Sequence, residues 1–88
     1  MADDKFKASQ DEVKKLKARP SNEELLDLYA LYKQGTEGNV KGDRPGMFNL
    51  KERAKYDFWA TKKDMKSDDA QTKYVKLVDT LIKKYGKA

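Results

Sequence analysis

The 88-residue sequence contains no cysteine and no histidine. The absence of cysteine excludes disulfides and thiolate chemistry, and it fits a reducing compartment. Without either residue, a nucleophile and its base would have to come from Ser or Thr with Lys or a carboxylate, and no such pair stands at a suitable spacing. The sequence therefore predicts a protein that is not an enzyme.

Carboxylates are the only remaining side chains that commonly bind metal ions. The pairs Glu23-Glu24 and Asp68-Asp69 both stand where a helix is expected to begin. Capping and the positive end of the helix dipole explain acidic residues at such positions. Neither a metal site nor a cofactor is expected.

Long hydrophobic runs are also missing. The N-terminal segment MADDKFKASQDEVKKLK lacks the apolar core of a secretory signal. No run approaches the ~20 apolar residues that a membrane span needs. We therefore expect a cytoplasmic protein.

Charge, by contrast, is abundant. Charged residues make up 40% of the sequence, and 20 basic against 15 acidic residues give a net charge of +5. Residues of the two charge signs are interleaved, as in DEVKKLK, which is typical of a solvated surface with many ion pairs. The excess favours an anionic partner. Nucleic acid is not expected as that partner, because no long, uniformly basic track is present.

The length suits one domain, residues 1–88, with a single modest core. Residues 4–16 carry apolar side chains at helical spacing and are predicted to form a short first helix. Ser21 and Glu24 make a capping box directly before an apolar run, so a second helix should begin there. This helix is predicted to end near Gly35.

Residues 35–49 contain four of the five glycines and show no periodicity, which predicts a long loop. Loops of this length in compact domains are usually functional or mobile. A third helix is expected over residues 50–62. Its inward-facing side chains are predicted to include Ala54, Phe58 and Trp59.

The last helix has the clearest pattern in the chain. Ser67 or Asp68 is expected to cap its start, and Lys83 and Lys84 followed by Gly86 form a typical C-terminal signature. Its apolar seam repeats at threes and fours through Ala70, Tyr74, Leu77, Val78, Leu81 and Tyr85. The sequence thus predicts an all-α fold, a small four-helix bundle.

Two phenols and an ammonium group stand close together near the end of the second predicted helix. Tyr29, Tyr32 and Lys33 are three and four positions apart, so we expect them to project together beside the apolar seam. Phenols and ammonium groups can bind phosphate, and aromatic faces can stack on a ring. The pattern favours a small anionic ligand with an apolar part, held between helices. The alternative is a helical protein-interaction module whose aromatic residues line a partner groove.

Three segments resemble one known family. LYALYKQGTEG, then RPGMFNLKERAKYDFW, then KYVKLVDTLIKKYG follow in order. Together they are similar to the acyl-CoA-binding protein (diazepam-binding inhibitor) family over essentially the whole chain. The resemblance implies an up-down-down-up four-helix bundle. It also implies non-catalytic binding, buffering and intracellular transport of medium- to long-chain fatty acyl-CoA esters, with the acyl tail shielded from water.

The resemblance also implies individual site residues. It assigns Lys33 and Lys55, with the Tyr29 hydroxyl, to the phosphates of coenzyme A, and Tyr32 to stacking on adenine. The full set expected to contact acyl-CoA is Lys14, Tyr29, Ala30, Leu31, Tyr32, Lys33, Lys55 and Tyr74. The acyl groove or the core should include Phe6, Leu25 and Leu28, and the sequence does not distinguish these two roles.

The sequence departs from the usual family pattern at Gly35, Glu37 and Asn39, and in the segment Tyr56-Asp57-Phe58-Trp59. Gly35 is expected to fray the end of the second helix by up to ~1 kcal/mol relative to Ala. None of these departures removes an expected head-group contact. The resemblance is also compatible with a monomer that contacts membranes or acyl-CoA-using enzymes transiently.

Overall fold

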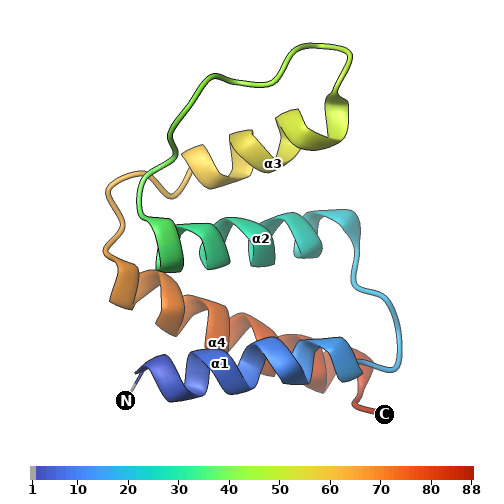
Figure 1. Cartoon of the computed structure of the whole chain (residues 1–88). Helices are drawn as coiled ribbons and strands as arrows, with labels where there is room; N and C mark the ends of the chain where they lie inside the picture. The colour runs from blue at the N-terminus through green and yellow to red at the C-terminus, as the bar shows by residue number, and fades with distance from the viewer. Residues whose placement is uncertain (1) are drawn as a thin grey trace.

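A computed structural model describes residues 2–88, with side chains described from residue 4, so residue 1 of the expected domain lies outside it. Over this range the chain forms four α-helices and one 3-10 turn. They are α1 (Ala2–Glu12), η1 (Val13–Lys15), α2 (Asn22–Glu37), α3 (Leu50–Ala60) and α4 (Ser67–Tyr85). Figure 1 shows α1 and α4 running in one direction and α2 and α3 in the other. The predicted all-α, up-down-down-up arrangement is confirmed.

The start of α2 is fixed by the predicted capping box. The Ser21 hydroxyl accepts a hydrogen bond from the Glu24 amide at 3.2 Å, and the Glu24 carboxylate accepts one from the Ser21 amide at 2.8 Å. Glu24 also accepts a hydrogen bond from the Tyr85 hydroxyl at 2.5 Å and one from Lys84 at 3.1 Å. These contacts lower the pKa of Glu24 to about 2, and the hydrogen bond from Tyr85 has the largest effect. One side chain thus connects the beginning of α2 with the end of α4.

The end of α2 differs from its prediction. The helix continues past Gly35 to Glu37, and Gly38 ends it with a φ of +82° that favours glycine. Gly35 is buried, and a Cβ atom there would lie 2.9 Å from Cγ of Gln71 in α4. The expectation that Gly35 frays the helix was wrong, because this residue allows α2 and α4 to approach closely. The predicted third helix is also shorter than expected and ends at Ala60.

The predicted cap of α4 was wrong as well. Lys66 occupies the capping position without a side-chain hydrogen bond, whereas Ser67 and Asp68 already belong to the helix. The Ser67 hydroxyl lies 3.5 Å from the Gln34 carbonyl of α2, so a contact between helices replaces the local cap. The predicted end of α4 is confirmed, since Gly86 follows the last turn with a φ of +82°.

The core lies between α1, α2 and α4. Phe6 of α1 packs edge-on against Tyr74 of α4, with ring centroids 5.1 Å apart. The other core side chains, all buried, are Leu28, Leu31, Ala70, Val78 and Leu81. No helix within residues 2–88 combines the length and apolarity that crossing a bilayer requires.

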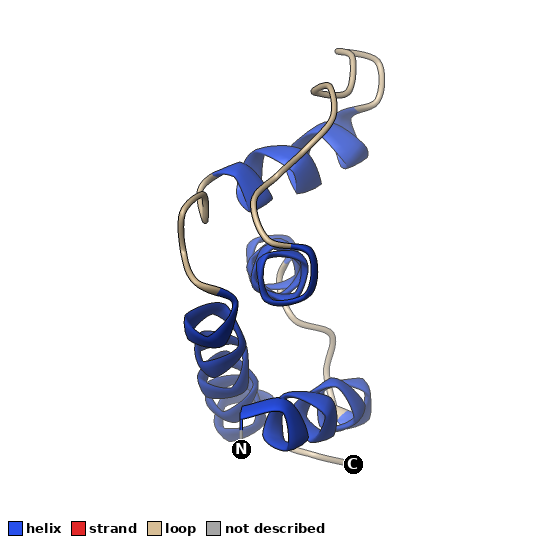
Figure 2. Cartoon of the chain, turned by 60° about the vertical axis from the view of Figure 1, so that its left-hand side comes forward, coloured by secondary structure: helices blue, strands red, loops and turns tan. Residues whose placement is uncertain are grey.

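Among the helices of residues 2–88, α3 packs against α2 alone. Figures 1 and 2 show it on the side of α2 that faces away from α1 and α4. Of its predicted inward residues, Trp59 is buried, while Ala54 and Phe58 are half-buried. Because α3 has a single helical neighbour, the surface between α2 and α3 is open to solvent along one edge.

Candidate functional site

A cavity of about 420 Å³ lies between α2 and α3, and we call it the α2–α3 groove. Apolar side chains line it from both helices, and polar and cationic groups stand among them. The lining residues are Arg19, Asn22, Leu25, Leu26, Tyr29, Leu50, Lys51, Ala54 and Lys55. An apolar cavity with a few polar groups is typical of small-molecule sites.

Tyr29 and Lys55 face each other across this groove. The Lys55 ammonium lies 5.3 Å from the centre of the Tyr29 ring, a cation–π contact. Lys55 also lies 3.4 Å from the Glu52 carboxylate one turn earlier on α3. The groove therefore contains a positive charge whose position is fixed by an aromatic face and a carboxylate.

Lys33 follows one turn after Tyr29 on α2. Its ammonium lies 5.0 Å from the centre of the Trp59 ring of α3 and forms an ion pair with Glu37. The hydrogen bond to Glu37 raises the pKa of Lys33, so this side chain is cationic at neutral pH. An anion that binds Lys33 has to compete with Glu37 for it.

The Tyr32 side chain projects from the other side of α2, toward α1 and α4. Its ring centroid lies 6.0 Å from that of Phe6 and 6.5 Å from that of Tyr74. With Phe6 it lines a second cavity of about 430 Å³, the aromatic cavity, together with Lys7, Gln10, Gly35, Thr36 and Gln71. Burial is the main cause that raises the pKa of the Tyr74 hydroxyl, and the nearby Tyr32 raises it further. The Tyr74 hydroxyl therefore stays neutral. The Tyr32 residue itself is 39% exposed.

The expected site residues therefore divide between two sides of α2. Tyr29 and Lys33, four positions apart, both contact α3 as predicted. The prediction that Tyr32 projects with them was wrong, because Tyr32 contacts Phe6 and Tyr74 instead. Lys14 lies exposed in η1 and lines neither the α2–α3 groove nor the aromatic cavity.

The apolar candidates also divide. Leu25 is half-buried and lines the α2–α3 groove. Phe6, Leu28, Ala30 and Leu31 are buried in the structure, and of these only Phe6 lines the aromatic cavity. In the ligand-free chain Leu25 therefore lies at the α2–α3 groove, whereas Leu28, Ala30 and Leu31 lie in the interior.

Several lining residues were not predicted, among them Arg19, Leu26, Leu50 and Lys51. Leu50 with Ala54 and Lys51 with Lys55 are pairs spaced by four, so each pair lies on one face of α3. This spacing was a signal that could have identified Leu50 and Lys51 from the sequence. Arg19 precedes α2 in a segment without periodicity, and no comparable signal marks it.

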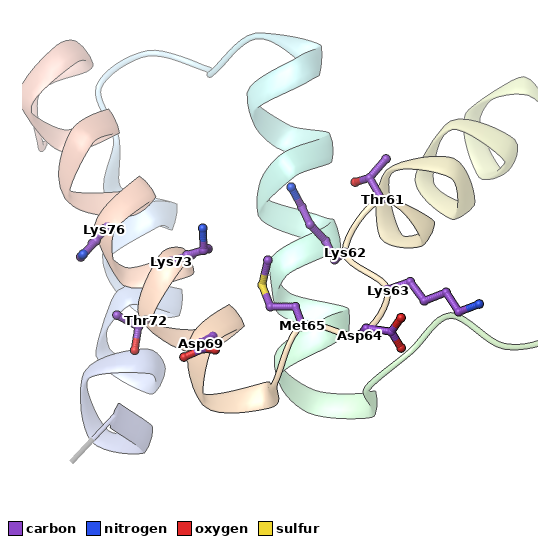
Figure 3. Close-up of a pocket in the computed structure, with 9 residues that line it drawn as sticks. All are labelled: Thr61, Lys62, Lys63, Asp64, Met65, Asp69, Thr72, Lys73 and Lys76. Carbon is purple, nitrogen blue, oxygen red and sulfur yellow. The ribbon is translucent and has the colours of Figure 1, made fainter.

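A larger cavity of about 540 Å³ lies beside the segment that connects α3 to α4, and Figure 3 shows its lining. Met65 lies there between Lys62 and Lys73, and the other lining residues are Thr61, Lys63, Asp64, Asp69, Thr72 and Lys76. None of the expected ligand residues lines this cavity. In residues 2–88, no three acidic side chains converge as a metal site would require.

Comparison with known proteins supports the resemblance. A family model described as "Acyl CoA binding protein" matches residues 3–78. The chain is 60% identical over 74 residues to acyl-CoA-binding protein homolog 1 of Caenorhabditis elegans, covering 84% of this chain and 86% of that relative. It is 47% identical over 74 residues to the acyl-CoA-binding protein of Saccharomyces cerevisiae, covering 84% of this chain and 85% of the relative. The crystal structure of Oryza sativa acyl-CoA-binding protein 2 superposes with a TM-score of 0.90 at 37% identity, covering 94% of this chain and 90% of the other.

Proposed function

Since the chain belongs to the acyl-CoA-binding protein family, we propose that it binds, buffers and transports fatty acyl-CoA esters without catalysing a reaction on them. The observation that best supports a site is the position of Lys33, Lys55 and Tyr29 beside the apolar α2–α3 groove. This combination suits an amphiphile with a phosphorylated head and a hydrocarbon tail.

In this proposal the phosphates of coenzyme A contact Lys33, Lys55 and the Tyr29 hydroxyl. The adenine ring stacks on the exposed face of Tyr32, which lies less than one turn away from Tyr29 and Lys33 on α2. Lys14 and Tyr74 complete the head-group contacts, as the family pattern implies. The ligand would therefore extend across α2 from the α3 side to the aromatic cavity.

The acyl tail is proposed to lie on the apolar side chains of the α2–α3 groove, among them Leu25 and Ala54. Burying one methylene contributes about 0.8 kcal/mol, so a tail of roughly 16 carbons yields on the order of 10 kcal/mol before several kcal/mol of ordering costs. The tail then supplies much of the affinity, and the head-group contacts distinguish acyl-CoA from a free fatty acid. We further propose a cytoplasmic monomer, as expected from the sequence.

Replacing either proposed phosphate ligand should weaken binding without unfolding the protein. Lys33→Ala and Lys55→Ala are each expected to lower the affinity for palmitoyl-CoA roughly tenfold, because each removes a charged hydrogen-bond donor. In the free protein each lysine forms one ion pair and one cation–π contact, both near the surface, so stability should change by no more than about 1–2 kcal/mol. Titration calorimetry and thermal unfolding measure the two effects.

Lys62→Ala is the matched control. The Lys62 side chain has nearly the same exposure as that of Lys33, 21% against 22%, and also pairs with a carboxylate, that of Asp27. It lines the larger cavity beside the α3–α4 connection instead of the proposed site. An equal loss of affinity in Lys62→Ala would show that total charge, not the proposed contacts, determines binding.

A further inference from the structure

Three exposed apolar side chains lie together where the loop 38–49 meets α3. Met47, Phe48 and Leu50 are 74%, 106% and 72% exposed, and we call them the apolar tip. Among the side chains described in residues 4–88, the next most exposed large apolar one, Tyr32, reaches only 39%. Figures 1 and 2 show this part of the loop at the end of the molecule remote from α1 and both termini. Exposed apolar groups concentrated at one point mark an interaction surface.

The backbone of the apolar tip is fixed by local contacts. Met47 and Phe48 are the two central residues of a turn that the Asn49 amide closes with a 3.0 Å hydrogen bond to the Gly46 carbonyl. Just before this turn, Arg44 donates hydrogen bonds of 2.8 and 2.7 Å to the two carboxylate oxygens of Asp57 in α3. The turn thus presents its apolar side chains to solvent, although it is attached to the fold on both sides.

The surroundings of the apolar tip are basic. Residues 38–57 contain five basic and three acidic side chains, and Asp57 pairs with Arg44. Lys41 and Lys51, on either side of the tip, are exposed. Apolar side chains flanked by lysine and arginine bind anionic lipid surfaces, because the apolar groups enter the interface while the cations contact phosphates. We propose that the apolar tip docks this protein onto an anionic lipid bilayer, with Met47 and Phe48 inserted among the headgroups.

A bilayer fits this surface better than a second copy of the chain does. Two chains of net charge +5 repel each other, and three side chains cover far less than the ~800 Å² that each partner of a stable dimer buries. A turn that projects from the molecule needs no shape complementarity to enter a fluid interface.

The apolar tip is continuous with the proposed ligand site. Leu50 belongs to the tip and also lines the α2–α3 groove, next to Lys51. An acyl-CoA whose tail is inserted in a membrane has its headgroup at the membrane surface. Docking would therefore bring the mouth of the groove to the depth of that headgroup. From there the ligand could pass between the bilayer and the groove. This transfer rests on the proposed function, whereas docking itself does not require a ligand.

Co-sedimentation of the ligand-free protein with lipid vesicles tests the docking. The vesicles consist of phosphatidylcholine with phosphatidylserine, or of phosphatidylcholine alone. We expect the protein to bind the anionic vesicles and to lose binding as the salt concentration rises. The double variant Met47→Ser/Phe48→Ser should bind them at least about tenfold more weakly, since two inserted apolar side chains are lost.

Phe48→Leu is the matched control and should bind the anionic vesicles nearly as the wild type does, because it preserves an apolar side chain at the turn. All variants should bind palmitoyl-CoA equally in the absence of vesicles, since Met47 and Phe48 line neither cavity of the proposed site.

Equal vesicle binding by wild type and double variant would overturn the docking proposal. A dimer in sedimentation that the double variant abolishes would also overturn it, in favour of a second copy. Failure of the wild type to bind palmitoyl-CoA would refute the proposed function and leave the vesicle result intact.

Discussion

Lys33 and Lys55, the two cations assigned to the phosphates, each have a carboxylate on the same helix. Glu37 forms an ion pair with Lys33, and Glu52 lies 3.4 Å from Lys55. Glu37 is also one of the positions at which the sequence departs from the usual family pattern. Its carboxylate keeps Lys33 charged and positioned, but it competes with an incoming phosphate.

Removing the charge of Glu37 should therefore strengthen ligand binding. Glu37→Gln is expected to raise the affinity for palmitoyl-CoA about two- to fivefold, because an exposed ion pair contributes only modestly. Glu12→Gln provides the control, because Glu12 pairs with Lys87 at 3.3 Å and the substitution makes the same change in net charge away from the site. Calorimetry at one salt concentration compares the two. If both variants gained affinity equally, only net charge would matter.

Other single residues show where prediction from the sequence ended. Gly35 is explained by Gln71, which stands 36 positions later, and local helix propensity could not reveal that contact. Asn39 accepts a hydrogen bond from the Asp64 amide at 2.7 Å and donates one to the Asp64 carboxylate at 3.3 Å. An aspartate at position 39 would bring two carboxylates together here. Both departures are accounted for by contacts that only the folded chain creates.

At the scale of elements, the features with local signals were predicted well. The capping box at the start of α2, the apolar seam of α4 and the glycine after its last turn all depend on residues within a few positions of one another. The start of α4 was predicted incorrectly because Ser67 contacts the Gln34 carbonyl of another helix. The α2–α3 groove was only partly predicted, since it depends on which faces of two helices meet.

The loop 38–49 is more firmly attached than its composition suggests. The Trp59 indole donates a 2.8 Å hydrogen bond to the Gly38 carbonyl, and the Tyr56 hydroxyl donates one of 3.0 Å to the Gly42 carbonyl. Arg44 adds the bidentate contact with Asp57. These three contacts connect the loop to α3 at successive points. Glycine content alone therefore predicted the loop but not its attachment.

The contact of Glu24 with α4 makes the junction of two helices sensitive to acid. The pKa of Glu24 is lowered to about 2 from an ordinary value of 4.5. A carboxyl group with a lowered pKa stabilises the fold fully above its unfolded pKa, and this contribution is lost as the pH falls toward the folded value. The ionised Glu24 should therefore stabilise the protein at pH 7 and cease to do so between pH 4.5 and about 2.

Glu24→Gln tests this dependence while preserving a side chain that can complete a capping box. At pH 7 the variant should melt below the wild type, because a neutral amide binds Tyr85 and Lys84 less strongly than a carboxylate does. Thermal unfolding measured at about pH 7, 4 and 2 should show the difference shrinking as the pH falls. A difference that stayed constant over this whole range would contradict the assigned pKa.

At the scale of the whole molecule, packing leaves space for a ligand. The helices α1, α2 and α4 share the core, and among the helices of residues 2–88 α3 packs on α2 alone. The sequence predicted four helices, and the family resemblance supplied their arrangement, but neither could give the dimensions of the space between α2 and α3. That space contains apolar side chains with Tyr29 and Lys55 among them, which suits an amphiphile.

The central claim is that the head and the tail of one ligand are recognised together. Titration calorimetry with palmitoyl-CoA, free coenzyme A and palmitate, in parallel and under the same conditions, tests it most directly. We predict that palmitoyl-CoA binds much more tightly than either fragment, because only the intact ester contacts both the lysines and the apolar groove. Palmitate binding as tightly as palmitoyl-CoA would contradict the account, since the assigned head-group contacts would then contribute nothing.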